Sequence, residues 1–88
     1  MLVLLDFYAD WCGPCKIMVP IFEEIEKKFK EKIEFKKIDV ETDEKMAAKF
    51  QVMSIPTFVL LKNDKEIDRK TGAMPKELLE NWLSDHLK

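Results

Sequence analysis

Cys12 and Cys15 are the residues of this chain best suited to chemistry, because together they form a Cys-x-x-Cys pair. Pro14, between them, favours the first turn of a helix, so Cys12 is expected at the N-terminus of that helix. Unpaired amide groups there favour the thiolate, which is the nucleophilic form of cysteine. Cys15, one turn later, is placed to attack a mixed disulfide at Cys12. The spacing predicts thiol–disulfide exchange, with Cys12 as the exposed attacking residue and Cys15 as the resolving one.

Half of a zinc site is the alternative interpretation of the same two cysteines. A closed structural zinc site needs four protein ligands. The chain has one further residue of the Cys and His types, His86, which lies far away near the C-terminus. The ligand count therefore favours redox chemistry over metal binding.

Asp6 is a lone carboxylate inside the apolar run Leu2–Tyr8. An uncompensated buried charge is costly, so burial is expected to raise the pKa of this group and to keep it protonated near neutral pH. Such a group near Cys15 would be a proton carrier. The alternative is an ordinary aspartate at the edge of a strand, pointing into water.

Four other residues have simpler interpretations. Trp11, in a loop beside Cys12, is expected on an exposed recognition surface. Trp82 belongs to the apolar face of the last helix and is expected in the core, whereas His86 is expected to be a solvated residue at the end of that helix. The bond before Pro56 is expected to be trans on sequence alone, because few X-Pro bonds in folded chains are cis.

Seven segments with strand or helix patterns must position these residues, in the order β-α-β-α-β-β-α. The ranges are a strand at Leu2–Tyr8, a helix from Pro14 to near Lys32, a strand at Ile33–Val40, a short helix capped by Thr42 or Asp43 with Met46, Ala47 and Phe50 as its apolar residues, strands at Thr57–Leu61 and Glu66–Lys70, and a helix that starts at Pro75. The first helix is predicted from apolar residues four apart, with two more beside them: Ile17, Ile21, Ile25, Phe29, Met18 and Phe22.

The connections between these segments predict an α/β fold. A strand-helix-strand opening implies a parallel pair of strands, while the tight turn at Asn63-Asp64 implies an antiparallel pair. The result is a mixed four-stranded sheet with helices on both faces. Composition agrees: 88 residues, 47% of them hydrophobic and 36% charged, suit a single domain over residues 1–88.

Charge and apolar runs exclude some classes of partner. The net charge is −2, and there is no basic arm or acidic tail, so neither nucleic acid nor a membrane is an expected partner. The apolar run at residues 1–5 ends at Asp6 and has no signal-peptide pattern. Both cysteines lie in one motif, which favours a reducing, cytoplasmic compartment.

The stretch Leu5–Lys16, LDFYADWCGPCK, resembles the active-site segment of the thioredoxin family. The hexamer Trp-Cys-Gly-Pro-Cys-Lys is far more specific than a bare Cys-x-x-Cys. The resemblance continues through Pro20, Lys37–Val40, Ser54–Thr57, the Lys62-Asn63 turn and Thr71–Ala73, and so covers nearly the whole chain. It implies the thioredoxin-like three-layer sandwich.

The resemblance also implies roles for individual residues. Asp6 would be the buried carboxylate that serves Cys15, with Lys37 as its neighbour, and Pro56 would be a cis-proline that faces the disulfide. An extended substrate segment would dock in the manner of an added β-strand. The rim on which this segment would dock would consist of Trp11, Gly13, Pro14, Val40, Ser54, Ile55, Pro56, Thr71, Gly72 and Ala73.

By the same resemblance the chain would reduce protein disulfides through Cys12 and Cys15. Its electrons would come from a partner of the thioredoxin-reductase type, with no cofactor beyond the redox-active disulfide and no metal. Two alternatives stay open: a binding module that holds a partner in the same groove without turnover, and a more oxidising disulfide oxidase or isomerase.

Two features depart from the family pattern. The family usually has a strand and a helix ahead of the strand that bears Asp6, where this sequence begins, so Ile33–Val40 is expected at a sheet edge and one face is expected to be less covered. Asn63-Asp64 stands where Asn-Gly is usual, which is expected to strain the turn. Charges along Ile33–Val40 oppose edge-to-edge pairing, so a monomer is expected. Its stability is expected to be modest, at the low end for single domains.

Overall fold

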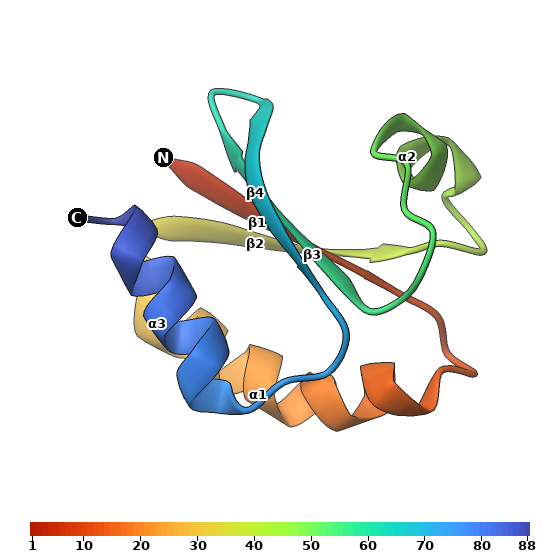
Figure 1. Ribbon diagram of the computed structural model, residues 1–88, viewed down its shortest axis with the longest axis horizontal. Helices are drawn as coiled ribbons and strands as arrows, with labels where there is room; N and C mark the ends of the chain where they lie inside the picture. Colours follow the sequence, from red (N-terminus) through yellow and green to blue (C-terminus); the bar gives the residue numbers. More distant parts are fainter.

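A computed structural model describes all 88 residues and shows the seven predicted elements in the predicted order. They are β1 (Leu2–Tyr8), α1 (Gly13–Phe29), β2 (Ile33–Asp39), α2 (Glu44–Lys49), β3 (Thr57–Lys62), β4 (Lys65–Thr71) and α3 (Lys76–His86). The sheet lies between two layers of helix, with α1 and α3 on one face and α2 on the other (Figure 1). The predicted mixed sheet with helices on both faces is confirmed.

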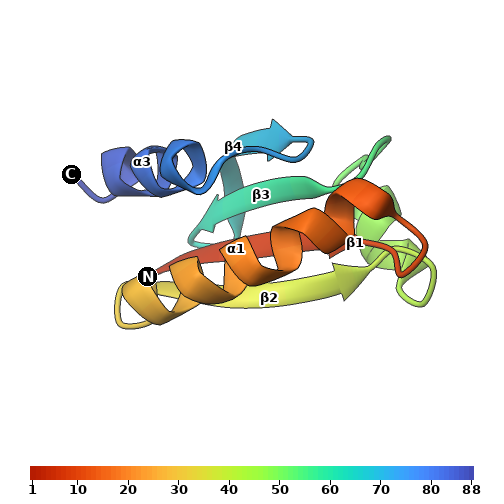
Figure 2. The same ribbon diagram turned by 90° about the horizontal axis from the view of Figure 1, so that it is seen from below.

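The strand order is β2-β1-β3-β4, which makes β1 and β3 the central strands and β2 an edge, as expected. β1 runs parallel to β2 and antiparallel to β3, and β3 runs antiparallel to β4. Figure 2 shows α1 crossing the side of the sheet that holds β1 and β2, with α3 towards β4. This arrangement puts the end of β1 directly before the start of α1.

β1 is buried on both faces, which explains why its sequence is almost continuously apolar. Because side chains of a strand alternate between faces, Leu2 and Leu4 join the core beneath α1 and α3, while Leu5 and Phe7 join the smaller core beneath α2. Asp6 continues the first of these two series. Strand alternation therefore directs its carboxylate towards α1.

The buried stripe of α1 differs from the predicted one. It consists of residues three and four apart, as a helix packed on a sheet requires: Cys15, Met18, Phe22, Ile25 and Phe29. Ile17, which belongs to the apolar series from which the helix was predicted, lies outside the stripe and is 62% exposed. The helix also ends at Phe29 rather than near Lys32, because a tight turn closed by the Lys32 amide and the Phe29 carbonyl (2.8 Å) leads directly into β2.

α2 is short and is fixed at its start by a side-chain cap. Of the two predicted capping residues, Asp43 is the one used: its Oδ1 accepts a hydrogen bond from the Met46 amide at 3.2 Å. Phe50, just after the helix, packs on Phe7 of β1 with the ring centroids 5.9 Å apart. None of the three helices is both long enough and apolar enough to cross a membrane.

α3 is tied to β4 by polar side chains at its C-terminal end. Asp68 of β4 accepts a hydrogen bond from Trp82 Nε1 at 2.8 Å and shares a bond of 2.9 Å with His86 Nε2. Trp82 is buried, as predicted. His86 is half-buried and bonded, so its prediction as a solvated residue is wrong: the sequence does not show that β4 places a carboxylate opposite it.

The turn between β3 and β4 has positive φ angles at both central residues, 53° at Asn63 and 67° at Asp64. Both angles are those of the type I′ turn that two-residue hairpin connections favour. In this left-handed region an L-residue is strained, and Asp tolerates the strain better than most residues do. The expected strain therefore falls mainly on Asp64, where the common form of the turn has glycine.

We expect Asp64→Gly to raise the free energy of unfolding by about 0.5 kcal/mol. The reason is that relief of the left-handed strain, about 1 kcal/mol, exceeds the added entropy of the unfolded chain. Asp64→Ala should instead lower the free energy of unfolding, because alanine keeps the strain and loses the polar side chain. Urea melts of the three proteins measure both effects, and equal destabilisation by glycine and alanine would contradict this account.

Candidate active site

Cys12 caps α1, and Cys15 lies in the first turn of that helix. Their sulfur atoms form a disulfide, with the two Cα atoms 5.2 Å apart. The Cys15 amide donates a hydrogen bond to Cys12 Sγ at 3.1 Å. In the reduced protein an amide in this position favours negative charge on the Cys12 sulfur, because the N-terminus of a helix has unpaired donors. The expected placement of Cys12 at the helix N-terminus is confirmed.

The two cysteines do not differ in overall exposure, 4% for Cys12 and 5% for Cys15, so the expectation of an exposed Cys12 is wrong for the oxidised protein. Both are covered by one small apolar cluster with Ala9, against which Val40 and Ile55 pack. They differ in what they face. Cys12 Sγ lies 4.0 Å from the carbonyl oxygen of Ile55, whereas Cys15 lines a cavity on the other side of the disulfide.

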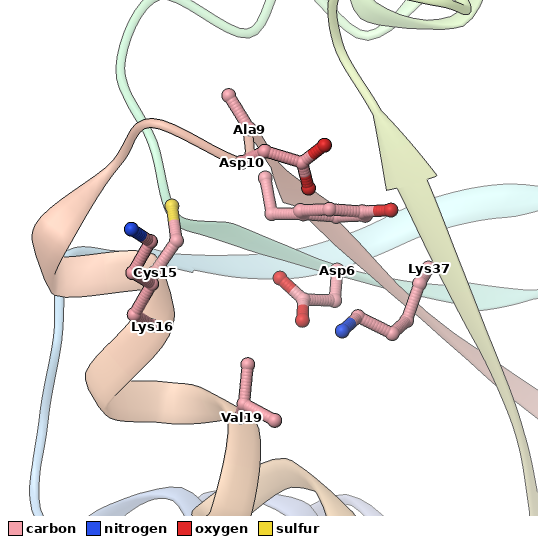
Figure 3. Close-up of a pocket in the computed structure, with 8 residues that line it drawn as sticks. Asp6, Ala9, Asp10, Cys15, Lys16, Val19 and Lys37 are labelled. Carbon is pink, nitrogen blue, oxygen red and sulfur yellow. The ribbon is translucent and has the colours of Figure 1, made fainter.

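This cavity has a volume of about 130 Å³ and lies between β1, β2 and the start of α1 (Figure 3). Asp6 and Cys15 both line it. Asp6 is 4% exposed, and its Oδ1 is buried without a hydrogen-bond partner in the protein. The alternative of an aspartate that points into water is therefore wrong.

Burial raises the pKa of Asp6 to about 6, because the desolvated carboxylate is penalised, and the nearby Lys37 ammonium lowers it in part. Lys37 lies directly opposite Asp6 in the parallel register of β1 and β2. Its Nζ lies 4.6 Å from the ring centroid of Tyr8. Tyr8 was not singled out from the sequence, although strand alternation from Asp6 places it on the same face of β1.

The bond between Ile55 and Pro56 is cis. The trans bond expected from sequence alone is wrong, and the cis bond implied by the family resemblance is confirmed. On one side of the proline the Thr57 hydroxyl donates to the Ser54 carbonyl at 2.6 Å, and on the other the Gly72 amide donates to the Pro56 carbonyl at 2.8 Å. The β3 entry and the β4–α3 connection thus form one surface beside the disulfide.

The predicted rim residues divide into two groups. Val40 and Ile55 pack directly on the cysteine cluster, and the neighbouring side chain of Trp11 is 66% exposed, as expected. Pro56 itself is buried. The second group is linked to the cluster through α1 or through Pro56, and apart from the half-buried Gly72 its members are exposed: Gly13, Pro14, Ser54, Thr71, Gly72 and Ala73.

The sequence reasoning did not find the places of two methionines, one on this surface and one beneath it. Met53, just before Ser54, is 93% exposed. Met18, named from the sequence only as an apolar residue of the first helix, is buried. Its Sδ accepts a hydrogen bond from the Met74 amide at 3.4 Å and so supports the connection that carries Gly72. Neither role follows from helix or strand periodicity, because each depends on segments that meet only in the folded chain.

Side chains of His, Cys, Asp and Glu nowhere gather in a group of three or more that could hold a metal ion. His86, which the zinc alternative would need, is bonded to Asp68 at the end of α3. The two cysteines therefore have no further ligands around them for a closed zinc site. What the arrangement provides is a disulfide at a helix N-terminus, an open surface on one side and a buried acid on the other.

Comparisons with known proteins agree with this chemistry. The thioredoxin family model matches residues 1–85. Thioredoxin of Bacillus subtilis (strain 168) is 42% identical over 85 residues, which are 97% of this chain and 82% of that protein. Thioredoxin of Staphylococcus aureus is 43% identical over 84 residues, covering 96% of this chain and 81% of the relative.

A solved structure gives the same result for the fold. A mutant thioredoxin from Halobacterium salinarum NRC-1 superposes with a TM-score of 0.91 at 30% identity, and the match covers 99% of this chain and 75% of that one. The cysteine pair described above has the spacing of the family's active site. This chain belongs to the thioredoxin family and is a thiol–disulfide oxidoreductase.

Proposed function

We propose that this protein reduces disulfides of other proteins, with Cys12 as the attacking cysteine and Cys15 as the resolving one. The observation that carries the assignment is the different surroundings of the two sulfur atoms. Cys12 caps α1 and faces the Ile55 carbonyl at the open rim, whereas Cys15 faces the cavity that contains Asp6. A substrate sulfur thus approaches Cys12 from the rim, and Asp6 is the proton acceptor next to Cys15.

The reaction has two steps. The Cys12 thiolate attacks one sulfur of the substrate disulfide, forms a mixed disulfide and releases the other substrate sulfur as a thiolate. The Cys15 thiol then passes its proton to Asp6 and attacks the Cys12 sulfur, which forms the Cys12–Cys15 disulfide and releases the second substrate sulfur. Two electrons pass from the cysteine pair to the substrate.

The substrate is an extended segment that carries a disulfide and lies along the rim. The exposed Trp11 supplies a large apolar contact beside Cys12. The hydrogen bond from the Gly72 amide to the Pro56 carbonyl fixes the backbone on the opposite side. Backbone groups on that side are suited to pair with an added strand.

The electrons are returned to the cysteine pair by a reductase of the thioredoxin-reductase type. The exchange steps need no bound cofactor or metal, because the disulfide itself carries the electrons. Residues 1–88 act as one domain and as a monomer, since the β2 edge presents charges that oppose strand addition: Glu34, Lys36, Lys37 and Asp39.

Reduction of insulin by dithiothreitol, with the protein as catalyst, tests this function. We expect the wild type to accelerate the precipitation of the insulin chains and Cys12→Ser to abolish the acceleration. Asp64→Gly, remote from the disulfide, is a matched control and should retain the wild-type rate. A wild-type protein that binds insulin without reducing it would instead indicate a binding module.

The order of attack predicts which cysteine variant traps a substrate. Cys15→Ser should accumulate a stable mixed disulfide with a disulfide-containing protein, because the resolving thiol is missing. Cys12→Ser should accumulate none, since the buried Cys15 faces the Asp6 cavity instead of the rim. Non-reducing electrophoresis after acid quenching measures both, and equal trapping by the two variants would refute the assignment.

The raised pKa of Asp6 predicts a pH-dependent loss of stability in the oxidised protein. The carboxyl ionises near pH 4 when unfolded but near pH 6 when folded, so the folded state binds more protons between these values. The contribution of Asp6 to the free energy of unfolding should therefore fall as pH rises from about 4 to about 6 and level off above. Asp6→Asn removes this penalty, and its stability relative to wild type should grow by about 1 kcal/mol between pH 5 and pH 8.

Urea melts of both oxidised proteins at the two pH values measure this difference. A difference that stays constant between the two pH values would contradict a buried Asp6 carboxyl with a raised pKa. The same variant tests the proton-acceptor role separately, because it should slow the release of substrate from a preformed mixed disulfide about tenfold or more. Unchanged release would remove Asp6 from the mechanism while leaving the stability result intact.

A further inference from the structure

Tyr8 and Lys37 form a contact at the cavity that the exchange chemistry does not require. Tyr8 follows Asp6 by two residues in β1, so both side chains lie on the same face of that strand. The Lys37 Nζ lies 4.6 Å from the Tyr8 ring centroid, well within the range of a cation–π contact. In Figure 3 the Lys37 ammonium extends towards Asp6. Tyr8 and Lys37 both line the cavity.

No ion pair accounts for the position of the Lys37 ammonium. Its neighbour on β2, Lys36, pairs with Glu34 at 3.3 Å, whereas Lys37 takes part in none of the ion pairs of the structure. A lysine at an edge strand is otherwise free to turn its ammonium into water. The face of Tyr8 is the close side-chain contact that the structure shows for this ammonium, beside the longer-range attraction of Asp6.

We propose that Tyr8 is a positioning residue that holds Lys37 over the cavity and thereby favours the ionised form of Asp6. This inference rests on the proposed role of Asp6 as proton acceptor for Cys15. Lys37 is the charged residue that lowers the pKa of Asp6, so any freedom of its side chain weakens that effect. Tyr8 would act on the proton transfer through Lys37, without touching the reacting sulfur atoms.

The other groups around Asp6 come from every element that encloses the cavity. They are Tyr8 of β1, Asp10 of the β1–α1 connection, Cys15 and Lys16 of α1, and Lys37 of β2. Burial and the nearby carboxylates of Asp39, Asp10 and Asp6 raise the pKa of Tyr8, so the phenol stays neutral at physiological pH. The ring therefore contributes its aromatic face and no charge of its own.

A simple covering role for Tyr8 makes the opposite prediction. If the ring served only to exclude water, its loss would hydrate Asp6 and lower the pKa of that carboxyl, because desolvation is the main cause of the rise. If the ring holds Lys37, its loss releases the ammonium and raises the pKa further. The sign of the change separates the two roles.

The test is a titration of the Asp6 carboxyl carbon by NMR in the oxidised protein, in which no thiol titrates nearby. We expect Tyr8→Leu to move the titration midpoint upward by about 0.5 pH, as the loss of a partly exposed cation–π contact would cause. Tyr8→Phe keeps an aromatic face and should leave the midpoint in place. Tyr8→Met, equally apolar and without a ring, provides the same test if Tyr8→Leu does not fold.

A second set of variants shows whether the effect passes through Lys37. Lys37→Gln should raise the midpoint, and Tyr8→Leu should then add no further rise in that background. Lys36→Gln removes an adjacent charge already paired with Glu34, and as a matched control it should leave the midpoint unchanged. A midpoint that stays or falls in Tyr8→Leu, or that rises equally with and without Lys37, would overturn the proposal.

The kinetic readout keeps this inference distinct from the proposed function. The pH dependence of substrate release from the mixed disulfide should shift upward in Tyr8→Leu by the same amount as the NMR midpoint. If Asp6→Asn leaves that release unchanged, the proton-acceptor role fails, yet the NMR titration still decides what Tyr8 does. If substrate release depends on Asp6 but the Asp6 titration midpoint is unchanged in Tyr8→Leu, only the positioning role of Tyr8 fails.

Discussion

Burial of β1 on both faces is the constraint on which the rest of the structure depends. The strand lies between β2 and β3 in the sheet and contributes to two apolar cores, one beneath α1 and α3 and one beneath α2. Strand alternation then leaves Asp6 facing α1, in a buried place where a carboxylate is poorly solvated. The resulting rise in the pKa of Asp6 makes a simple carboxyl able to exchange protons near neutral pH.

The start of α1 brings a cysteine pair next to this buried acid. Cys12 caps the helix, where amide groups favour a thiolate, and Cys15 follows one turn later on the buried stripe that also contains Met18 and Phe22. The stripe directs Cys15 towards β1 and the cavity of Asp6. The two cysteines thus have different surroundings, the Ile55 carbonyl for Cys12 and the Asp6 cavity for Cys15, although their overall exposure is nearly equal.

The open side of the disulfide depends on long-range contacts. Ile55 reaches Cys12 from the entry of β3, and the Gly72 amide bonds to the Pro56 carbonyl from the connection between β4 and α3. Gly72 has a φ of 96°, which an L-residue rarely adopts, so the turn that brings this connection to the proline requires glycine. The rim surface and the Asp6 cavity therefore lie on opposite sides of the disulfide and are built from different parts of the chain.

The sequence by itself determined the element order, the mixed sheet and the Cys-x-x-Cys at a helix start, because each follows from local periodicity, turn residues or a motif. It offered a buried Asp6 as one of two alternatives, and the structure decided between them. Only the tertiary structure decided that Ile17 is exposed, that His86 is bonded to Asp68, and that Cys12 is covered in the oxidised state. It likewise decided that Tyr8 lies against Lys37. These features depend on side chains from separate elements that meet through strand register and helix packing, and no local pattern encodes which residue will lie opposite another.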